Sequence, residues 1–398
     1  MAAYQFQTEV SQLLELITHS LYSHKEVFLR ELVSNASDAI DKLNYLTVSD
    51  DAYKTFSFQP RITVKLDEDA RTITVSDNGI GMDQTELADN LGTIARSGTR
   101  AFLERLGEQD RKASNLIGQF GVGFYSAFMV ADQIEVISRK PGSEQAWLWK
   151  SDGKSGFDIE PAMRDGHGTD VVLHINENGA EFLSRWTLED LLKRYSNHIA
   201  WPIHLVTREK TYAKDPSKAE TKVVDEQVNA ASALWRRPKS ELSAQDYIDF
   251  YKSLTGDDKE PLFWIHTHAE GTIEYSSLLY IPSHVPADLY IPTREQGIKL
   301  YIKRVFITDR ELQILPPYFR FVRGVIESDD LPLNVSREML QHNRVLTTIQ
   351  QATLKKLFSE LEQLSTANPE KFATFVSLFN PQIKEGIVSD WTNREQLL

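Results

Sequence analysis

The sequence predicts an α+β fold with more than one domain, for three reasons. Two helix-like segments, 8–22 and 25–46, come before a run of strand-like segments. The first two strand segments, 61–66 and 72–76, alternate apolar and polar residues around an acidic turn at 67–69, which is typical of a hairpin with one buried face. Because that face needs an apolar cover, we expect helices on one face of a mostly antiparallel sheet. The length agrees, since 398 residues suffice for two or three domains.

The later elements follow in chain order. A glycine-punctuated stretch runs from Asp77 to Gly123. After it the pattern predicts a short helix over 124–130 and strands over 133–139, 146–150 and 169–175. The first domain is therefore expected to span 1–207.

A charged segment, 208–230, has few large apolar residues and predicts an exposed linker. A second α/β domain is expected over 231–398. Its strongest strand pattern covers 298–307, and apolar positions between 346 and 364 predict a long amphipathic helix. Residues 391–398 resemble the start of another helix without a stop signal, so we expect the chain to be cut short.

Composition excludes several classes of function. The formal net charge of −13 and the pI near 5.3 give no long-range attraction to nucleic acid or to anionic membranes. No basic secretion leader and no apolar stretch near the roughly 20 residues of a membrane span is present in the sequence, so we expect a cytosolic protein. The cysteine count of zero excludes disulfides, thiol catalysis and thiolate metal sites.

One helix face carries the first candidate site. Glu31, Asn35, Asp38 and Lys42 are spaced four, three and four residues apart, which places them within an arc of roughly 60° beside a broad apolar stripe. Such a helix has polar groups at the edge of a buried face. The alternative is a solvated face on which Asp38 and Lys42 form an ordinary i,i+4 ion pair.

A second candidate site directly follows the strand over 72–76. In the turn from Asp77 to Gly81, the glycines at 79 and 81 allow a ligand to approach the backbone. A carboxylate fixed at a sheet edge suits an exocyclic amino group such as that of adenine. The alternative is an ordinary strand-ending turn, which Asp-Asn-Gly favours anywhere.

The third candidate site is a glycine-rich loop. Gly118, Gly121 and Gly123 stand immediately before the helix expected over 124–130, and free N–H groups at a helix amino end suit phosphate. The alternative is a flexible loop joined to a helix. Separately, Arg337 falls in the first turn of a helix expected near Ser336, where the dipole disfavours a cation and an outward reach toward an anion makes sense.

Taken together, these motifs resemble the heat-shock protein 90 chaperone family along the whole chain. The segments that carry the resemblance are 28–39, 77–82, 92–99, 118–128 and 321–341. The short segment between the two expected domains is similar to that of bacterial members. The resemblance implies an N-terminal two-layer α/β ATPase domain, of the fold shared with gyrase, histidine-kinase and mismatch-repair ATPases, followed by an α/β middle domain.

The resemblance also implies roles for individual residues. Asp77 would hold the adenine amino group, Asn35 would reach Mg²⁺, and Glu31 would act as general base toward the attacking water. Segment 92–123 would be a lid over ATP, and Arg337 would contact the γ-phosphate. Further nucleotide contacts are implied for Asp38, Met82, Asn90, Arg96, Gly118, Gly121, Val122, Gly123, Phe124 and Thr169. For Arg96, a solvated lid cation is an equal alternative.

The function implied is that of an ATP-dependent chaperone, which binds and slowly hydrolyses Mg·ATP and acts on unfolded or partly folded client proteins. The family forms homodimers through a C-terminal domain that this sequence lacks. Two alternatives stay open, a DNA-linked ATPase of the same fold class and a protein-binding module that does not hydrolyse nucleotide. The net negative charge counts against a DNA-linked ATPase. In the protein-binding module, Glu31 would have no catalytic role. For Trp264, Tyr280 and Phe306, packing in the core is the default expectation, in preference to a role in client binding or catalysis.

Overall fold

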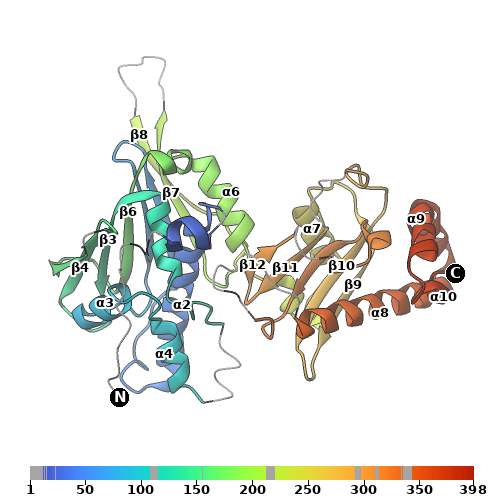
Figure 1. Ribbon diagram of the computed structural model, residues 1–398, viewed down its shortest axis with the longest axis horizontal. Helices are drawn as coiled ribbons and strands as arrows, with labels where there is room; N and C mark the ends of the chain where they lie inside the picture. The colour runs from blue at the N-terminus through green and yellow to red at the C-terminus, as the bar shows by residue number, and fades with distance from the viewer. Residues whose placement is uncertain are drawn as a thin grey trace, which may run out of the picture. The chain divides into compact units, whose positions relative to one another are not determined.

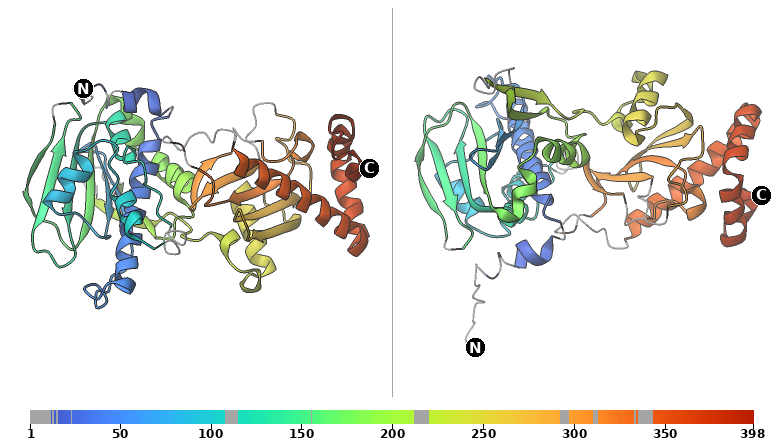
Figure 2. Two further views of the ribbon diagram at one scale, coloured as in Figure 1. Left: turned by 60° about the horizontal axis from the view of Figure 1, so that its bottom comes forward. Right: turned by 90° about the horizontal axis from the view of Figure 1, so that it is seen from above.

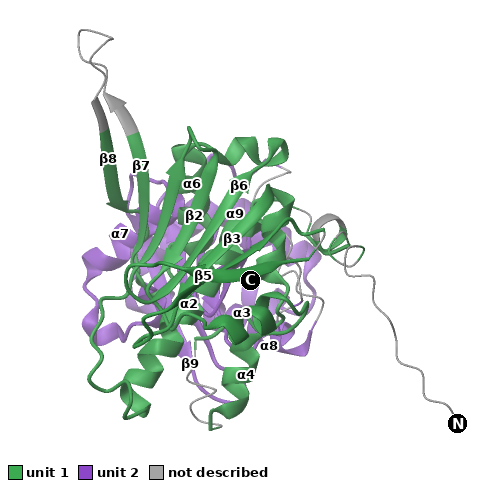
Figure 3. Cartoon of the chain, turned by 90° about the vertical axis from the view of Figure 1, so that its left-hand side faces the viewer, with its two compact units in different colours: residues 1–232 green, residues 233–398 purple. Residues whose placement is uncertain are grey.

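The computed structural model describes residues 12, 14, 16–22, 24–107, 115–154, 156–211, 220–291, 297–309, 313–332, 334 and 343–398. The chain divides into two compact units, unit 1 over residues 1–232 and unit 2 over residues 233–398 (Figure 3). Both units combine helices with a sheet, which confirms the predicted α+β class. Across the described ranges, no helix is both long and apolar enough to cross a membrane.

Unit 1 is built on an eight-stranded sheet in the order β5-β4-β3-β6-β2-β1-β7-β8. Figure 1 labels β4, β3, β6, β7 and β8 of this sheet. The strands are β1 Ile62–Asp67, β2 Thr72–Asp77, β3 Ala131–Arg139, β4 Ala146–Ser151, β5 Asp158–Ala162, β6 Gly168–Ile175, β7 Ile203–Thr211 and β8 Glu220–Gln227. Neighbouring strands are antiparallel except for the parallel pair β1 and β7. The register of β2 with β6 places Asp77 opposite Thr169, at the end of β2.

The helices of unit 1 include one long element that faces the sheet. They are α2 Val27–Ser49, α3 Gln84–Leu91, α4 Gly98–Arg105 and α6 Arg185–Ser196, with the shorter η1 Ile17–Leu21, η2 Gly123–Met129 and η3 Glu177–Phe182. Helix α2 packs on β1, β2 and β6 and beside α6, and Figure 2 shows both helices on one face of the sheet. Its buried side chains, among them Phe28, Leu32, Ile40 and Leu43, follow the helical period, so burial of this face stabilises the element.

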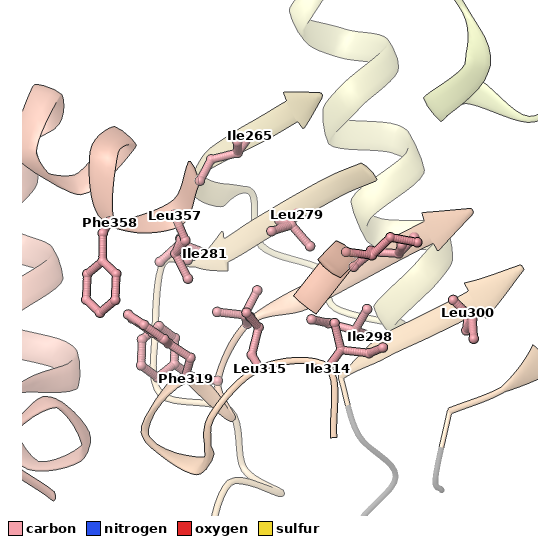
Figure 4. Close-up of a cluster of buried hydrophobic side chains, with 14 of the residues drawn as sticks. Ile265, Leu279, Ile281, Ile298, Leu300, Ile314, Leu315, Phe319, Leu357 and Phe358 are labelled. Atoms are coloured by element: carbon pink, nitrogen blue, oxygen red, sulfur yellow. The ribbon is translucent and has the colours of Figure 1, made fainter. Parts of the chain in front are cut away.

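Unit 2 contains a five-stranded sheet in the order β12-β11-β13-β10-β9. Its strands are β9 Pro261–Ala269, β10 Tyr275–Pro282, β11 Ile298–Ile302, β12 Val305–Thr308 and β13 Arg323–Glu327. Its helices are α7 Ala244–Thr255, α8 Arg344–Ala367, α9 Pro369–Ser389 and α10 Arg394–Leu397, with short turns η5 Leu234–Arg236, η6 Lys239–Glu241 and η7 Pro317–Phe319. One apolar cluster joins Leu357 and Phe358 of α8 to Ile265 and Leu279 of the sheet (Figure 4).

The strand predicted over 298–307 is in fact a hairpin. Strands β11 and β12 pair antiparallel, and the chain reverses at Lys303 and Arg304. These two residues have φ of 49° and 64°, as the central residues of a type I′ turn do. The prediction of one strand was wrong because neither residue is the glycine or asparagine that normally signals such a turn.

The linker expected over 208–230 also differs from the structure. Its described parts include the end of β7 and all of β8, which form a hairpin at one edge of the sheet of unit 1. The alternating 221–227 stretch has enough β-branched and apolar residues for an edge strand, although its charge resembles that of a loop. The two units divide between Ser232 and Ala233.

The helix expected over 8–22 lies partly outside the described residues. Within them, residues 12, 14 and 16 are α-helical and Ile17–Leu21 is π-helical, which agrees with a helix here.

Candidate functional site

The polar stripe of α2 lies at the edge of the core. Glu31 and Asp38 are each only 2% exposed, and Asn35 between them is partly buried. Arg30 is as buried as Glu31, and its Nε donates a hydrogen bond to Glu31 Oε1 at 3.2 Å. The alternative of a solvated helix face is therefore wrong for both carboxylates.

Asp38 binds the glycine-rich loop from α2. Its Oδ1 accepts the N–H of Ile117 at 2.9 Å, and its Oδ2 accepts the N–H of Gly118 at 2.8 Å. The hydroxyl of Thr99, in the first turn of α4, donates to the same Oδ2 at 3.0 Å and accepts from Lys42 Nζ at 2.7 Å. Lys42 is thus joined to Asp38 through Thr99, and burial lowers the pKa of the Lys42 ammonium.

The loop lies so close to α2 that a Cβ added at two of its glycines would displace side chains of the helix. A Cβ added at Gly118 would stand 2.9 Å from Asp38 Oδ2 and 3.2 Å from Asn35 Oδ1. A Cβ added at Gly123 would stand 2.3 Å from Glu31 Oε2. Glycine therefore permits the close approach of this backbone to three polar groups of one helix.

The helix after the loop is shorter and tighter than expected. Gly123–Met129 is a 3₁₀ helix, not an α-helix over 124–130, so a helix dipole contributes little here. Phosphate recognition by this segment would rest on the N–H groups of the loop itself. Val122 and Phe124 are buried, and the Phe124 ring packs edge-on to Trp149 with centroids 5.6 Å apart.

Asp77 is fixed at the end of β2. The side chain is 8% exposed, and its Oδ1 accepts the N–H of Gly79 at 2.8 Å. Burial raises the pKa of the Asp77 carboxyl to about 7, although the Gly79 N–H and the nearby Arg164 act in the opposite direction. A buried carboxylate with a raised pKa gains from a ligand that donates a hydrogen bond to it.

A chain of contacts joins Asp77 to three of the other residues implied by resemblance. Thr169 lies opposite Asp77, and its hydroxyl is 2.8 Å from Ser138 Oγ. Ser138 Oγ in turn accepts the N–H of Met82 at 2.8 Å, and Met82 Sδ lies 3.9 Å from Asn90 Nδ2. The four residues from separate parts of the sequence therefore line one region of unit 1.

The Asp77 turn and the glycine-rich loop meet at the same part of α2. The N–H of Ile80 donates to the carbonyl oxygen of Ala39 at 3.0 Å, one residue after Asp38. A Cβ at Gly79 would stand 2.4 Å from the carbonyl carbon of Ala39, so only glycine allows the turn to rest on the helix. One helix thus supports both the Asp77 turn and the glycine-rich loop at neighbouring residues.

The remaining predicted site residues differ in how far the structure describes them. Arg96 Nη2 pairs with Asp89 Oδ2 at 3.0 Å, and both side chains are about half exposed. A Cβ at Gly121, whose φ is +66°, would contact the backbone of Arg96. Arg337 and Ser336 lie outside the described residues.

The three aromatic residues of unit 2 are largely core residues, as expected. Tyr280 is fully buried and Phe306 is 3% exposed. The ring of Trp264 stacks on Tyr247 with centroids 5.0 Å apart.

Several residues at the site carry no sequence signal that reasoning from one chain could use. Arg164 and His167 contact the Asp77 turn, Ser138 links Thr169 to Met82, and Thr99 bridges Asp38 to Lys42. Each comes from a segment far from its partner in sequence. The register of β2, β3 and β6 brings Ser138 beside Thr169, whereas Thr99 reaches Asp38 from helix α4.

Comparisons with known proteins agree with this arrangement. A family model described as "Histidine kinase-, DNA gyrase B-, and HSP90-like ATPase" matches residues 22–156, and one described as "Hsp90 protein" matches residues 213–398. A chaperone protein HtpG of Treponema denticola is 54% identical over 409 residues, and one of Sulfurovum sp. is 52% identical over 400 residues. Each alignment covers 100% of this chain and 64% of the relative. The chain therefore spans about two thirds of the length of these relatives.

Proposed function

The chain belongs to the Hsp90 family, and on that premise we propose that unit 1 binds Mg·ATP and hydrolyses it in the cycle of a molecular chaperone. The ATPase-type match over 22–156 implies nucleotide binding in general. The matched relatives are longer than this chain, so hydrolysis, clients and assembly belong to the proposal.

One observation carries the proposal. The buried Asp77 turn and the glycine-rich loop both rest on α2 within the space of a few residues, at Ala39 and at Asp38. Adenine and phosphates are chemically opposite ends of one ligand, an amino-bearing ring and an anion. A carboxylate acceptor beside a set of backbone donors matches that pair.

Magnesium fits the same place through a single amide. Asn35 Oδ1 faces the loop backbone, 3.2 Å from the position of a Cβ at Gly118. Magnesium takes one or two protein ligands and completes its octahedron with phosphate oxygens and waters. No cluster of three or more His, Asp or Glu side chains suited to a metal occurs in the described part of the chain, so in this proposal the ATP phosphates supply the other anionic ligands.

Hydrolysis is assigned to two residues. Glu31 lies one helical turn before Asn35 on α2 and against Gly123, and so is placed to orient a water near the phosphates. Arg337 would neutralise charge on the γ-phosphate, as phosphoryl transfer requires. Its assignment rests on the family resemblance of segment 321–341.

The test is a titration of ATP paired with a turnover assay on single variants. Asp77→Asn should abolish ATP binding, whereas Glu31→Ala should keep binding and lose hydrolysis. Arg337→Ala should reduce hydrolysis with little loss of affinity. Binding of ATP that survives Asp77→Asn would overturn the adenine assignment.

The whole protein's role follows from the family in the same proposal. We propose that it acts in the cytosol on unfolded or partly folded client proteins and works as a homodimer when the rest of the family's chain is attached. The chain alone should then turn ATP over slowly, because association of two protomers without a tether lowers their effective concentration. Turnover at the rate of a dimeric relative would contradict this expectation.

A further inference from the structure

Arg164 contacts the backbone of Asp77 from the segment between β5 and β6. Its Nη2 donates to the carbonyl oxygen of Asp77 at 2.8 Å. The same guanidinium binds both carboxylate oxygens of Asp170 on β6, with Nε at 3.1 Å from Oδ2 and Nη2 at 2.9 Å from Oδ1. Its Nη1 donates to the carbonyl oxygens of Gly166 and His167. The Arg164 side chain is only 9% exposed, so these bonds fix its position.

The Asp77 carbonyl sits where β2 leaves the sheet. A Cβ at Gly168 would stand 2.0 Å from that oxygen, and Gly168 has a φ of +110°. Only glycine therefore lets β6 begin this close to the end of β2. The guanidinium donates to this oxygen from a side chain that is itself held by Asp170, and so fixes the orientation of the Asp77 peptide.

A second contact holds the same turn two residues later. The Nδ1–H of His167 donates to the carbonyl oxygen of Gly79 at 2.9 Å. Its ring packs edge-on to Phe56 and Phe58, with centroids 4.8 and 5.7 Å away. The segment that carries Arg164 is thus anchored to the turn at both of its ends.

We propose that Arg164, oriented by Asp170, is a positioning residue that sets the direction of the Asp77 carboxylate and so determines selectivity for a 6-amino purine. This inference rests on the proposed function, because it presumes that Asp77 reads adenine. An ion pair between Arg164 and Asp170 alone would explain two of the contacts. It would not explain why the Arg164 guanidinium also donates to the backbone carbonyl of Asp77, the residue whose carboxylate is predicted to face the ligand.

The physical reason is that selectivity between adenine and hypoxanthine depends on which partner donates the hydrogen bond at position 6 of the purine. An amino group donates to Asp77, whereas the carbonyl of inosine at the same position would face the carboxylate with a second acceptor. A site built to accept a hydrogen bond rejects the analogue that cannot donate it, by a large factor. Rotation of the Asp77 peptide by loss of the Arg164 donor would weaken the bond to ATP and leave the affinity for inosine triphosphate nearly unchanged.

The test measures dissociation constants of ATP and inosine triphosphate by calorimetry on the full chain. Arg164→Met should weaken ATP binding about tenfold, the effect of one lost hydrogen bond, and lower the ratio of the two affinities by the same factor. Arg164→Lys keeps the charge without the fork and should lower the ratio as well. Asp170→Asn should lower it less, and the double variant of Arg164→Met with Asp170→Asn should equal Arg164→Met alone, because Asp170 acts through Arg164.

Arg71→Met is the matched control, since Arg71 forms an exposed pair with Glu177 and its loss should leave both affinities unchanged. Melting temperatures show whether each variant folds. If Arg164→Lys and Asp170→Asn fold and keep the wild-type ratio while Asp77→Asn abolishes ATP binding, the positioning role is overturned and the proposed function stands. If the wild-type chain binds both nucleotides equally, the adenine assignment itself fails.

Discussion

Asp38 holds Gly118 to α2, with the Asp38 Oδ2 accepting the N–H of Gly118 at 2.8 Å. The other oxygen accepts the N–H of Ile117, so one buried carboxylate satisfies two successive backbone donors. These N–H groups belong to the loop in which phosphate recognition is predicted. The carboxylate therefore anchors the start of this loop to α2.

Asp38→Ala should release this loop. Loss of the acceptor leaves the N–H groups of Ile117 and Gly118 unpaired, at a cost of about 1 to 3 kcal/mol. We expect amide hydrogen exchange at these two residues to accelerate at least tenfold. Asp51→Ala is the control, because the Asp51 side chain is exposed in an ordinary i,i+3 pair with Lys54. Unchanged exchange at Gly118 would show that other contacts hold the loop.

Gly123→Ala should separate hydrolysis from binding. The added Cβ would fall 2.3 Å from Glu31 Oε2, so the Glu31 carboxylate has to move away from its place beside the loop. A displaced general base should reduce turnover by 10²-fold or more, on the order of the contribution of such a group. Affinity for ATP should change far less, because alanine keeps the backbone N–H that residue 123 offers to the phosphates, and Asp77 is untouched.

Gly107→Ala provides the matched control for that experiment. Gly107 also lies in the predicted lid, but nothing stands within 4 Å of its Cβ position and its φ lies outside the strained range. Its turnover should stay at the wild-type level. Equal loss of turnover in Gly107→Ala and Gly123→Ala would point to lid flexibility as the cause in place of displacement of Glu31.

Asp77→Asn should stabilise unit 1 in the absence of nucleotide. Burial raises the pKa of Asp77 to about 7, above its usual value near 4. The folded state therefore binds this proton more tightly than the unfolded state, and stability falls as the pH rises from about 4 to about 7. At pH 8 the protein bears the full cost of burying an ionised carboxylate. An asparagine at this position has no charge to bury, and its side-chain oxygen still accepts the N–H of Gly79.

The measurement is the melting temperature of both proteins at pH 5 and pH 8. The variant should melt at a higher temperature than wild type at pH 8. The corresponding gain in the free energy of unfolding is on the order of 1 to 3 kcal/mol, and it should be smaller at pH 5. A wild-type chain that is the more stable of the two at pH 8 would show that Asp77 is ionised at little cost.

The candidate site shows which features of a sequence can be read directly. The stripe from Glu31 to Lys42 was predictable because its members share one helix, whose period fixes their relative directions. The turn at Asp77 was predictable because strand, carboxylate and glycines are contiguous. In both cases local geometry alone sets the arrangement.

Features that depend on strand order were not predictable from one chain. Arg164 reaches Asp77 across 87 residues, and it does so only because β6 pairs with β2. The position of β8 at the sheet edge likewise depends on its pairing with β7. No spacing within the sequence carries that information, since pairing partners are chosen by the tertiary structure.

Glu327→Gln tests a buried network in unit 2. Glu327, 1% exposed, accepts from Trp235 Nε1 at 2.5 Å and from Arg236 Nε at 2.7 Å. Removal of the charge leaves Arg236, whose side chain is 24% exposed, with Asp329 as its remaining counter-ion, so we expect a cost of about 1 to 3 kcal/mol, below that of breaking a fully buried pair. We expect calorimetry to show a lower midpoint temperature for the unfolding of unit 2. Glu385→Gln removes the charge of the more exposed partner of Arg320. It should lower the free energy of unfolding of unit 2 by less than about 1 kcal/mol.

Lys303→Asn should stabilise the β11–β12 hairpin. Lys303 has a φ of 49°, a conformation that costs a lysine about 1 kcal/mol relative to residues suited to it, and asparagine is favoured at this place in a type I′ turn. Its backbone N–H, which donates to Asp329 Oδ1, is retained in the variant. Urea unfolding should show a gain of roughly 0.5 to 1 kcal/mol. Lys299→Asn, within β11, should have the opposite sign because asparagine is disfavoured in strands. A loss of stability in both variants would mean that contacts of the Lys303 side chain outweigh the relief of its backbone.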